Sequence, residues 1–242
     1  MGIATRLKLA RLIYLSPDQP DAVSDLASAA FAGGADAVVL VESLDAPIAD
    51  ATAAECIPEI REAARTTQGL TGYLGRPIRA AELAPDLLVL ADDAADAART
   101  RTRVGRWTMI GRRCNGTDEV DRALADPAVD FLLVGPGLPH IRHAAASAPA
   151  DDPTSKPWFA VGGVTLETLD AVLRAGAMRV GVGAAITEAS NPEEATRALK
   201  NRLRRAWNDD PRMEAVTAAA FGTSAGLTLQ PDASPRHTDL HL

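Results

Sequence analysis

Hydrophobic residues along this chain gather in short, uninterrupted runs that alternate with longer segments of mixed polarity. Several runs directly follow a glycine or aspartate, as where Gly33-Gly34-Ala35-Asp36 precedes the run at 37–41. Runs that are apolar throughout are typical of parallel strands buried on both faces. Eight candidate strands result: Leu12–Leu15, Ala37–Val41, Leu70–Leu74, Leu87–Leu90, Trp107–Ile110, Phe131–Val134, Trp158–Val161 and Arg179–Val182.

The segments between these runs have the residue spacing of amphipathic helices. The clearest helix starts after Asn191, with Pro192 at the first helical position and two glutamates in the first turn. Another is predicted from a cap at Thr165 to a stop at Gly176. Eight strand–helix units in alternation predict a closed (β/α)8 barrel rather than a doubly wound sheet. The 242 residues suit one such barrel, which commonly has ~250.

Two segments do not fit the repeat. Residues 138–157 show no apolar periodicity, so they are either an active-site loop at the end of the sixth strand or a disordered insertion. Residues 208–242 are predicted to form a C-terminal extension, with a short helix over 213–221 and an unstructured remainder. The predicted organisation is therefore a barrel over residues 1–207 followed by this extension.

Composition narrows the classes of partner. The net charge of −7 argues against a nucleic-acid or anionic-membrane surface, which would need a positive footprint. No apolar run reaches the ~18 residues that span a bilayer, and the first ten residues are too short and basic for a secretory signal. Cys56 and Cys114 indicate neither a disulfide framework nor a metal knuckle. We expect a cytoplasmic protein without nucleic-acid or membrane partners; the sequence leaves open a homo-oligomer.

Candidate chemistry lies where the predicted strands end, because barrels place their sites at the carboxyl ends of the strands. Gly162 and Gly163 follow the seventh strand, and Gly183 and Ala184 follow the eighth. Glycine lets backbone N–H groups approach an anion, and a helix beginning near Ala184 would add its positive end. We predict that these four residues bind a phosphate group. The alternative is that the glycines only form tight turns.

Three further side chains are candidates for catalysis or ligand binding. Glu42 ends the second strand, and Arg112 follows the fifth beside Arg113. An arginine there could bind a second phosphate or a carboxylate, but adjacent strand residues point to opposite faces, so at most one would face the site. His140 could transfer a proton, although solvated surface histidines are the alternative for both His140 and His143.

A metal site has weaker support. Asp92 and Asp93 follow the fourth strand and could bind a divalent cation. Such a cation normally takes carboxylates from more than one strand, and only Glu42 and Asp18 are obvious partners. No metal site is therefore predicted from the residues themselves.

The stretch 158–203, which begins WFAVGGVTLETLDAVLRAGAMRVGVGAAI, resembles the last two barrel units of the thiamine phosphate synthase family, which includes the thiazole tautomerases. The resemblance extends in layout over about residues 11–205 and residue by residue from about Ile110. A synthase of this family joins a hydroxymethylpyrimidine diphosphate to a thiazole phosphate, releasing pyrophosphate with Mg²⁺. The resemblance implies that Gly162, Gly163 and Gly183 hold the phosphate of a thiazole phosphate or thiamine phosphate.

The chain departs from the family pattern elsewhere. Of the polar residues in the strand-two motif Gln-Leu-Arg-Glu-Lys only Glu42 remains, the usual serine after strand eight is Ala184, and residues 139–142 replace a Thr-x-Thr-Lys run. The Asn-Asp pair after strand three falls on about Leu74-Gly75. A diphosphate leaving group needs its charge neutralised in the transition state. We therefore expect a divergent member that binds a phosphorylated small molecule with altered or lost synthase chemistry.

Two alternatives stay open. The first is an active thiamine phosphate synthase with a rebuilt diphosphate site, which would require Mg²⁺. The second is a non-catalytic barrel with a structural or regulatory role. A thiazole tautomerase would need only a phosphate site and one proton shuttle.

Overall fold

The computed structural model describes residues 1–17, 20–42, 50–91 and 95–225. Its parallel strands pair in sequence order and close into a barrel, because β1 pairs with both β2 and β8. The predicted (β/α)8 barrel is thereby confirmed. The strands are β1 (Leu12–Ser16), β2 (Ala37–Val41), β3 (Leu70–Leu74), β4 (Leu87–Leu90), β5 (Met109–Cys114), β6 (Phe131–Val134), β7 (Trp158–Ala160) and β8 (Val180–Val182).

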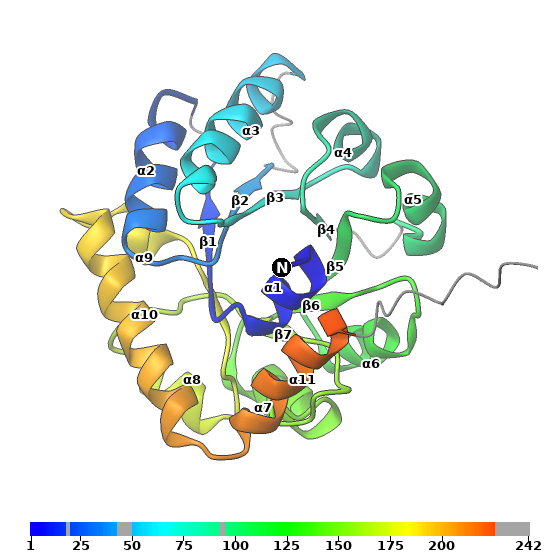
Figure 1. Cartoon of the computed structure of the whole chain (residues 1–242), viewed down its shortest axis with the longest axis vertical. Coiled ribbons are helices and arrows are strands. Elements are labelled where there is room, and N and C mark those ends of the chain that lie inside the picture. The colour runs from blue at the N-terminus through cyan, green and yellow to red at the C-terminus, as the bar shows by residue number, and fades with distance from the viewer. Residues whose placement is uncertain (18–19, 43–49, 92–94, 226–242) are drawn as a thin grey trace, which may run out of the picture.

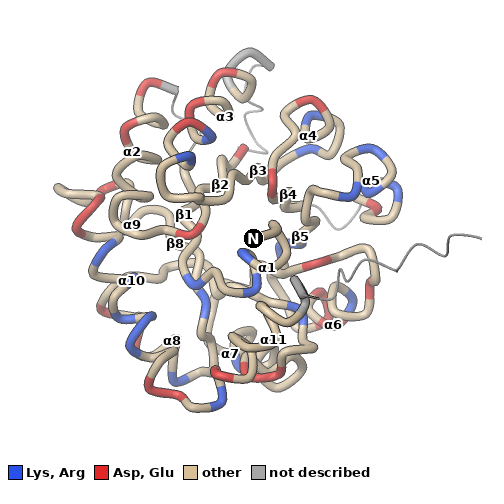
Figure 2. The backbone as a smooth tube through the Cα atoms, in the orientation of Figure 1, with Lys and Arg blue, Asp and Glu red and all other residues tan. Residues whose placement is uncertain are grey.

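Helices surround the barrel as an outer ring, while α1 lies across one end with α11 beside it (Figure 1). Acidic and basic residues are interspersed over this ring (Figure 2). Within the described ranges, no helix is long and apolar enough to cross a membrane. The helices are α1 (Ile3–Leu9), α2 (Pro20–Ala32), α3 (Asp50–Arg65), α4 (Pro77–Leu83), α5 (Ala97–Val104), α6 (Thr117–Ala125), α7 (Leu138–Ser147), α8 (Leu169–Arg174), α9 (Ala184–Thr187), α10 (Pro192–Asp209) and α11 (Met213–Ala225).

The fifth strand is the one element of the sheet whose position was predicted wrongly. It was expected over 107–110 but runs from Met109 to Cys114, so Arg112 and Arg113 lie within the strand. Trp107 precedes it and is 70% exposed. An apolar run does not mark this strand because two arginines follow its first residues. The other seven runs match their strands to within one residue at each end.

The expectation of an irregular segment over 138–157 is wrong for its first half. Residues 138–147 form α7, with a proline in the first turn and Ile141 and Ala144 buried. These positions and the buried Ala148 lie on one face of the helix. The stripe is hard to detect in sequence because alanines fill both faces of the segment. After the helix, the Trp158 indole N–H donates to the Ala148 carbonyl at 2.8 Å, which holds this connection against the barrel.

Helix ends agree with the sequence signals only in part. The Asn191 side chain accepts a hydrogen bond from the Glu194 N–H at 3.1 Å, as expected for the cap of α10. Thr165 and Thr168 instead exchange hydrogen bonds in a turn, and α8 begins only after Thr168. The predicted helix over 213–221 lies within α11. His237 and His241 belong to residues 226–242, outside the described part, and the division at residue 207 stays a prediction.

Apolar side chains form two concentric layers. The inner layer fills the barrel with residues such as Ile13, Val39 and Leu87, and Leu7 of α1 packs beneath them. Phe131 and Phe159 meet there edge to face, with ring centroids 6.3 Å apart. The outer layer packs the helices onto the strands. Since α1 covers the amino ends of the strands, the open end of the barrel is the end where the strands finish.

Candidate functional site

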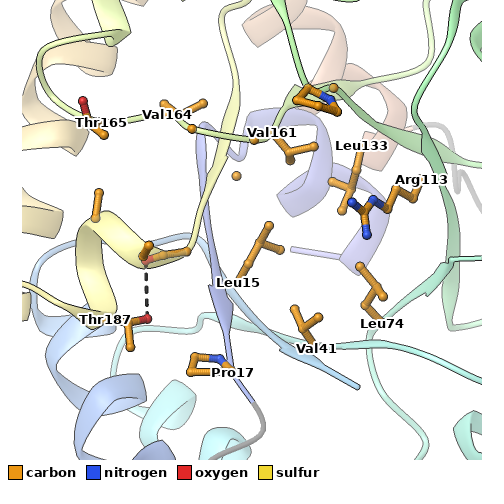
Figure 3. Close-up of a pocket in the computed structure, with 18 of the residues that line it drawn as sticks. Leu15, Pro17, Val41, Leu74, Arg113, Leu133, Val161, Val164, Thr165 and Thr187 are labelled. Atoms are coloured by element: carbon orange, nitrogen blue, oxygen red, sulfur yellow. Dashed lines mark hydrogen bonds between the residues drawn. The ribbon is translucent and has the colours of Figure 1, made fainter. Parts of the chain in front are cut away.

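A cavity of about 570 Å³ opens at the carboxyl ends of the strands, a volume in the range of small-molecule sites. We call it the mouth cavity. Its walls are mainly aliphatic, and the close-up in Figure 3 shows side chains from several strands converging on it. The apolar residues that line it include Leu15, Pro17, Val41, Leu74, Leu133, Pro136, Val161 and Val164.

The four residues predicted to bind phosphate, Gly162, Gly163, Gly183 and Ala184, all line this cavity. We call them the glycine corner. Gly162 and Gly163 have φ angles of +88° and +69°, in the left-handed region that favours glycine. A Cβ on Gly162 would also lie 2.7 Å from the Cβ of Pro136. The backbone conformation and the close packing therefore both require glycine at this turn.

Several backbone donors at this corner are available to an anion. The N–H groups of Gly163, Val164, Ala184 and Ala185 donate no hydrogen bond to another described residue. All four of these residues line the mouth cavity. Successive free N–H groups in such turns form concavities that bind anions. Because α9 has four residues, its contribution is these first-turn N–H groups rather than a large helix dipole.

Thr187 fixes α9 to the first strand. Its hydroxyl lies 2.9 Å from the hydroxyl oxygen of Tyr14 on β1. It also donates to the Gly183 carbonyl at 3.4 Å, and Figure 3 shows Thr187 at the wall of the cavity. Burial raises the pKa of Tyr14, although hydrogen bonds with Thr187 and Ser16 oppose the shift. Tyr14 thus stays a neutral hydroxyl group that positions the helix carrying half of the glycine corner.

Glu42 lies beside the cavity but does not line it within the described residues. Its side chain is buried and accepts hydrogen bonds from the Arg76 guanidinium, the Arg76 N–H and the Tyr73 hydroxyl. Burial alone would raise the pKa of Glu42, but the hydrogen bonds from Arg76 and Tyr73 lower it below its ordinary value. The candidate acid is therefore an ionised carboxylate whose contacts join the ends of β2 and β3.

The two arginines of β5 point to opposite faces, as the alternation of strand side chains predicted. Arg112 is only 7% exposed, donates to the Ala95 carbonyl at 2.7 Å and is not among the cavity-lining residues. Arg113 is exposed and lines the mouth cavity (Figure 3). The choice of Arg112 as a site candidate therefore needs correction. Arg113 takes its place because β5 extends through both residues.

The two histidines of α7 do not line the mouth cavity. His140 Nδ1 lies 2.6 Å from the carbonyl oxygen of Pro136, a residue that does line it. His143 Nε2 lies 2.7 Å from an Asp121 carboxylate oxygen on α6. His140 therefore contacts the backbone of a cavity residue and His143 contacts α6, but neither ring lines the cavity itself.

The described residues do not supply the carboxylates that a divalent cation needs. None of them form a group of three or more His, Cys, Asp or Glu side chains suited to a metal ion. Glu188 is the acidic side chain among the described cavity residues, and Glu42 is engaged by Arg76. Asp92 and Asp93 lie outside the described residues. The Mg²⁺ implied by the family resemblance therefore has no fitting set of ligands among the described side chains.

The family model and the curated relatives that match this chain's sequence point to one family. The family described as thiamine monophosphate synthase matches residues 12–186. The chain is 34% identical to the thiamine-phosphate synthase of Streptomyces avermitilis, over 80% of this chain and 94% of that protein. It is 31% identical to the thiamine-phosphate synthase of Saccharopolyspora erythraea, over 84% of this chain and 96% of that protein.

A solved structure supports the same fold. Thiamine phosphate pyrophosphorylase from Pyrococcus furiosus superposes with a TM-score of 0.70. The match covers 83% of this chain and 98% of that one, at 21% identity. At this level of identity the likeness establishes the barrel architecture.

Proposed function

Because this chain belongs to the thiamine monophosphate synthase family, we propose that its mouth cavity binds a phosphorylated small molecule of the thiazole phosphate or thiamine phosphate type. The glycine corner would hold the phosphate group, and the aliphatic walls would contact the ring. The observation that supports this most is the set of unpaired N–H groups at Gly163, Val164, Ala184 and Ala185.

Backbone donors suit a phosphate because its oxygens accept several hydrogen bonds at once. Leu15 and Val161 lie next to this corner in the cavity wall, where they offer apolar surface to a flat ring. A ligand with a phosphate at one end and an apolar ring at the other matches this division of the cavity. The replacement of a serine by Ala184 removes one hydroxyl but leaves the backbone donor in place.

Calorimetry with thiazole phosphate, thiamine phosphate and inorganic phosphate tests the proposal. We expect binding at millimolar concentration or tighter. Gly163→Asp should weaken it at least tenfold, because a carboxylate in the corner repels the phosphate. Gly163→Asn, similar in size but neutral, should weaken it less, since asparagine tolerates left-handed backbone.

Gly105→Asp is the matched control. Gly105 also has a positive φ of +79° and open space where a Cβ would lie, but it caps α5 outside the cavity. An aspartate there should therefore strain the backbone without changing the affinity. Absence of binding at millimolar ligand, or equal losses in Gly163→Asp and Gly105→Asp, would contradict the proposal.

A second candidate is thiamine phosphate formation itself, and the names of the relatives favour it. The proteins from Streptomyces avermitilis and Saccharopolyspora erythraea are both named as synthases. The expectation of altered or lost chemistry has no support in these comparisons. Purified protein with Mg²⁺, hydroxymethylpyrimidine diphosphate and thiazole phosphate should then release pyrophosphate. Ligand binding without turnover, together with failure to complement a thiamine auxotroph, would leave the binding function alone.

A further inference from the structure

A second, much smaller cavity lies at the closed end of the barrel, away from the mouth cavity. Its walls come from α1, from the connection between α7 and β7, and from α11, which lies beside α1 in Figure 1. We call it the basal cavity, and the residues that line it include Lys8, Asp152, Ser155, Lys156, Arg179 and Val216. We propose that the basal cavity binds a single halide ion, with chloride as its natural ligand.

Arg179, which directly precedes β8, carries the charge that an anion would neutralise. It is 4% exposed, and its Nη2 donates to the Lys8 carbonyl at 2.9 Å while the guanidinium stacks on Trp207. Its Nε has no hydrogen-bond partner, and its guanidinium forms no ion pair with a carboxylate in the described part of the chain. A buried cation without a counter-ion is costly, and a buried donor without a protein partner indicates a bound water or ion.

The two lysines of the basal cavity also lack a carboxylate partner among the described residues. The Lys8 ammonium donates to the Pro153 carbonyl at 3.4 Å, and the Lys156 ammonium donates to two backbone carbonyls at 3.1 and 2.6 Å. Backbone oxygens accept these hydrogen bonds but carry no full negative charge. Three cations therefore line one small cavity without neutralisation by direct ion pairs.

Nearby acidic side chains are engaged by other groups. Asp152 is the acidic side chain among the described residues of the lining, and its oxygens accept hydrogen bonds from Thr154 and Ser155. Asp130, close to Lys156, pairs with Arg101. On the other side of Arg179, Arg11 stacks on the same Trp207 ring and adds a like charge. Burial and this neighbour both lower the pKa of Arg179, to about 10.

The size of the basal cavity selects the kind of anion. Its volume is about 10 Å³, which is room for one particle of about the size of a water molecule. A phosphate or an organic carboxylate is too large for this space. A water molecule could accept a hydrogen bond from Arg179, but it would not balance the charge. A halide ion does both.

Urea unfolding of the full chain in sodium chloride and in sodium gluconate at equal ionic strength tests the proposal. Gluconate is too large for the basal cavity, so the comparison cancels general screening by salt. The folding equilibrium constant of the wild type should be about tenfold larger in chloride, the factor expected when a ligand exceeds its dissociation constant tenfold. In Arg179→Met this ratio should fall to about one. In gluconate the variant should be at least as stable as the wild type, because the unpaired buried cation is gone.

Arg174→Met is the matched control, because Arg174 is exposed at the end of α8 and does not line the basal cavity. It should keep the wild-type ratio. Equal stability of the wild type in the two salts, or a ratio that survives in Arg179→Met, overturns the proposal.

Two further measurements do not depend on the folding of Arg179→Met. Lys8→Met should also reduce the ratio, and wild-type crystals grown in bromide should show an anomalous scattering peak in contact with the Arg179 Nε. Absence of the peak overturns the proposal, as does a peak without the response in solution, which would mean an adventitious ion only. Because the mouth cavity lies at the other end of the barrel, the proposed binding of a phosphorylated molecule is tested separately.

Discussion

The carboxylate of Glu42 accepts two hydrogen bonds from the guanidinium of Arg76, at 3.2 and 2.8 Å, and thereby joins the end of β2 to the connection after β3. The same carboxylate accepts the hydroxyl of Tyr73 and lies 3.9 Å from Arg79. A buried carboxylate with these partners is stable as an anion and poor as a proton acceptor. These contacts give a structural reason for the position of Glu42 at the end of β2, in addition to the catalytic role that the sequence suggested.

Glu42→Gln tests that explanation. Removing the charge leaves buried donors facing a neutral amide, so the free energy of unfolding should fall by about 2–4 kcal/mol at pH 7. The folded-state pKa of Glu42 is lowered, so its contribution is complete above the unfolded pKa of about 4.3 and is lost as pH falls through the folded value. Urea unfolding of the wild type and of Glu42→Gln should show that the difference between their free energies of unfolding shrinks as the pH falls from 7 to 3.

Glu62→Gln is the control for this series. Glu62 pairs with Arg65 on the surface of α3, where both side chains are largely exposed. Its replacement should change the free energy of unfolding by less than about 0.5 kcal/mol. Equal effects of the two substitutions would show that burial and pairing do not determine how much Glu42 contributes to the free energy of unfolding.

The contact between Tyr14 and Thr187 should couple the first strand to the glycine corner. Thr187→Val removes the hydroxyl without changing the side-chain shape, and should cost about 1–2 kcal/mol of unfolding free energy. Phosphate-ester affinity should also fall, because α9 carries the N–H groups of Ala184 and Ala185. In a double-mutant cycle with Tyr14→Phe, we expect a coupling of about 1 kcal/mol. Additive effects would mean that the hydroxyl groups act independently.

Gly111 leaves room for an aromatic ring inside the barrel. A Cβ there would lie 2.4 Å from Cζ of Phe131, whose side chain is fully buried and cannot move aside. Gly111→Ala should lower the free energy of unfolding by about 2–3 kcal/mol, and Phe131→Leu should recover part of the loss in the double variant. Gly116→Ala meets nothing within 4 Å and should cost less than about 1 kcal/mol. Similar losses at both glycines would argue against crowding as the cause.

Arg179 carries a buried charge at the closed end of the barrel. It is 4% exposed, its guanidinium stacks on Trp207, and its Nε has no hydrogen-bond partner among the described residues. Arg179→Met should leave the unfolding free energy at neutral pH unchanged or raise it by about 1–2 kcal/mol, because a desolvated cation is replaced by an apolar chain. The exposed Arg174→Met should change it by less than about 0.5 kcal/mol.

The direction in which stability changes with pH gives an independent check on the buried charge of Arg179. Burial lowers the pKa of Arg179 to about 10, and nearby Arg11 contributes in the same direction. The unfolded state therefore binds the proton more tightly, so wild-type stability relative to Arg179→Met should rise as pH passes through 10. Chemical unfolding of the wild type and of Arg179→Met at pH 8 and pH 11 would measure this change in relative stability. If the difference between their unfolding free energies is the same at both pH values, the prediction is contradicted.

Local sequence patterns were sufficient for the barrel and for part of the site. Seven strands could be placed because their runs are buried on both faces. The glycine corner could be found because its residues follow two adjacent strands. Arg113 could not be distinguished from Arg112, since the strand that contains them lacks an apolar signature at its end. Helix α7 was missed because alanine on both faces weakens the contrast that marks a buried stripe.

The sequence by itself determined the succession of buried strands and covering helices, together with the turns that only glycine can form. These are local properties, since burial and backbone conformation leave their pattern in consecutive residues. The tertiary structure decided which arginine of β5 faces the mouth cavity and that the charge of Glu42 is paired with Arg76. It also decided that the glycine corner and Arg113 line one cavity. These relationships depend on strand register and barrel closure, which bring together residues far apart in the chain.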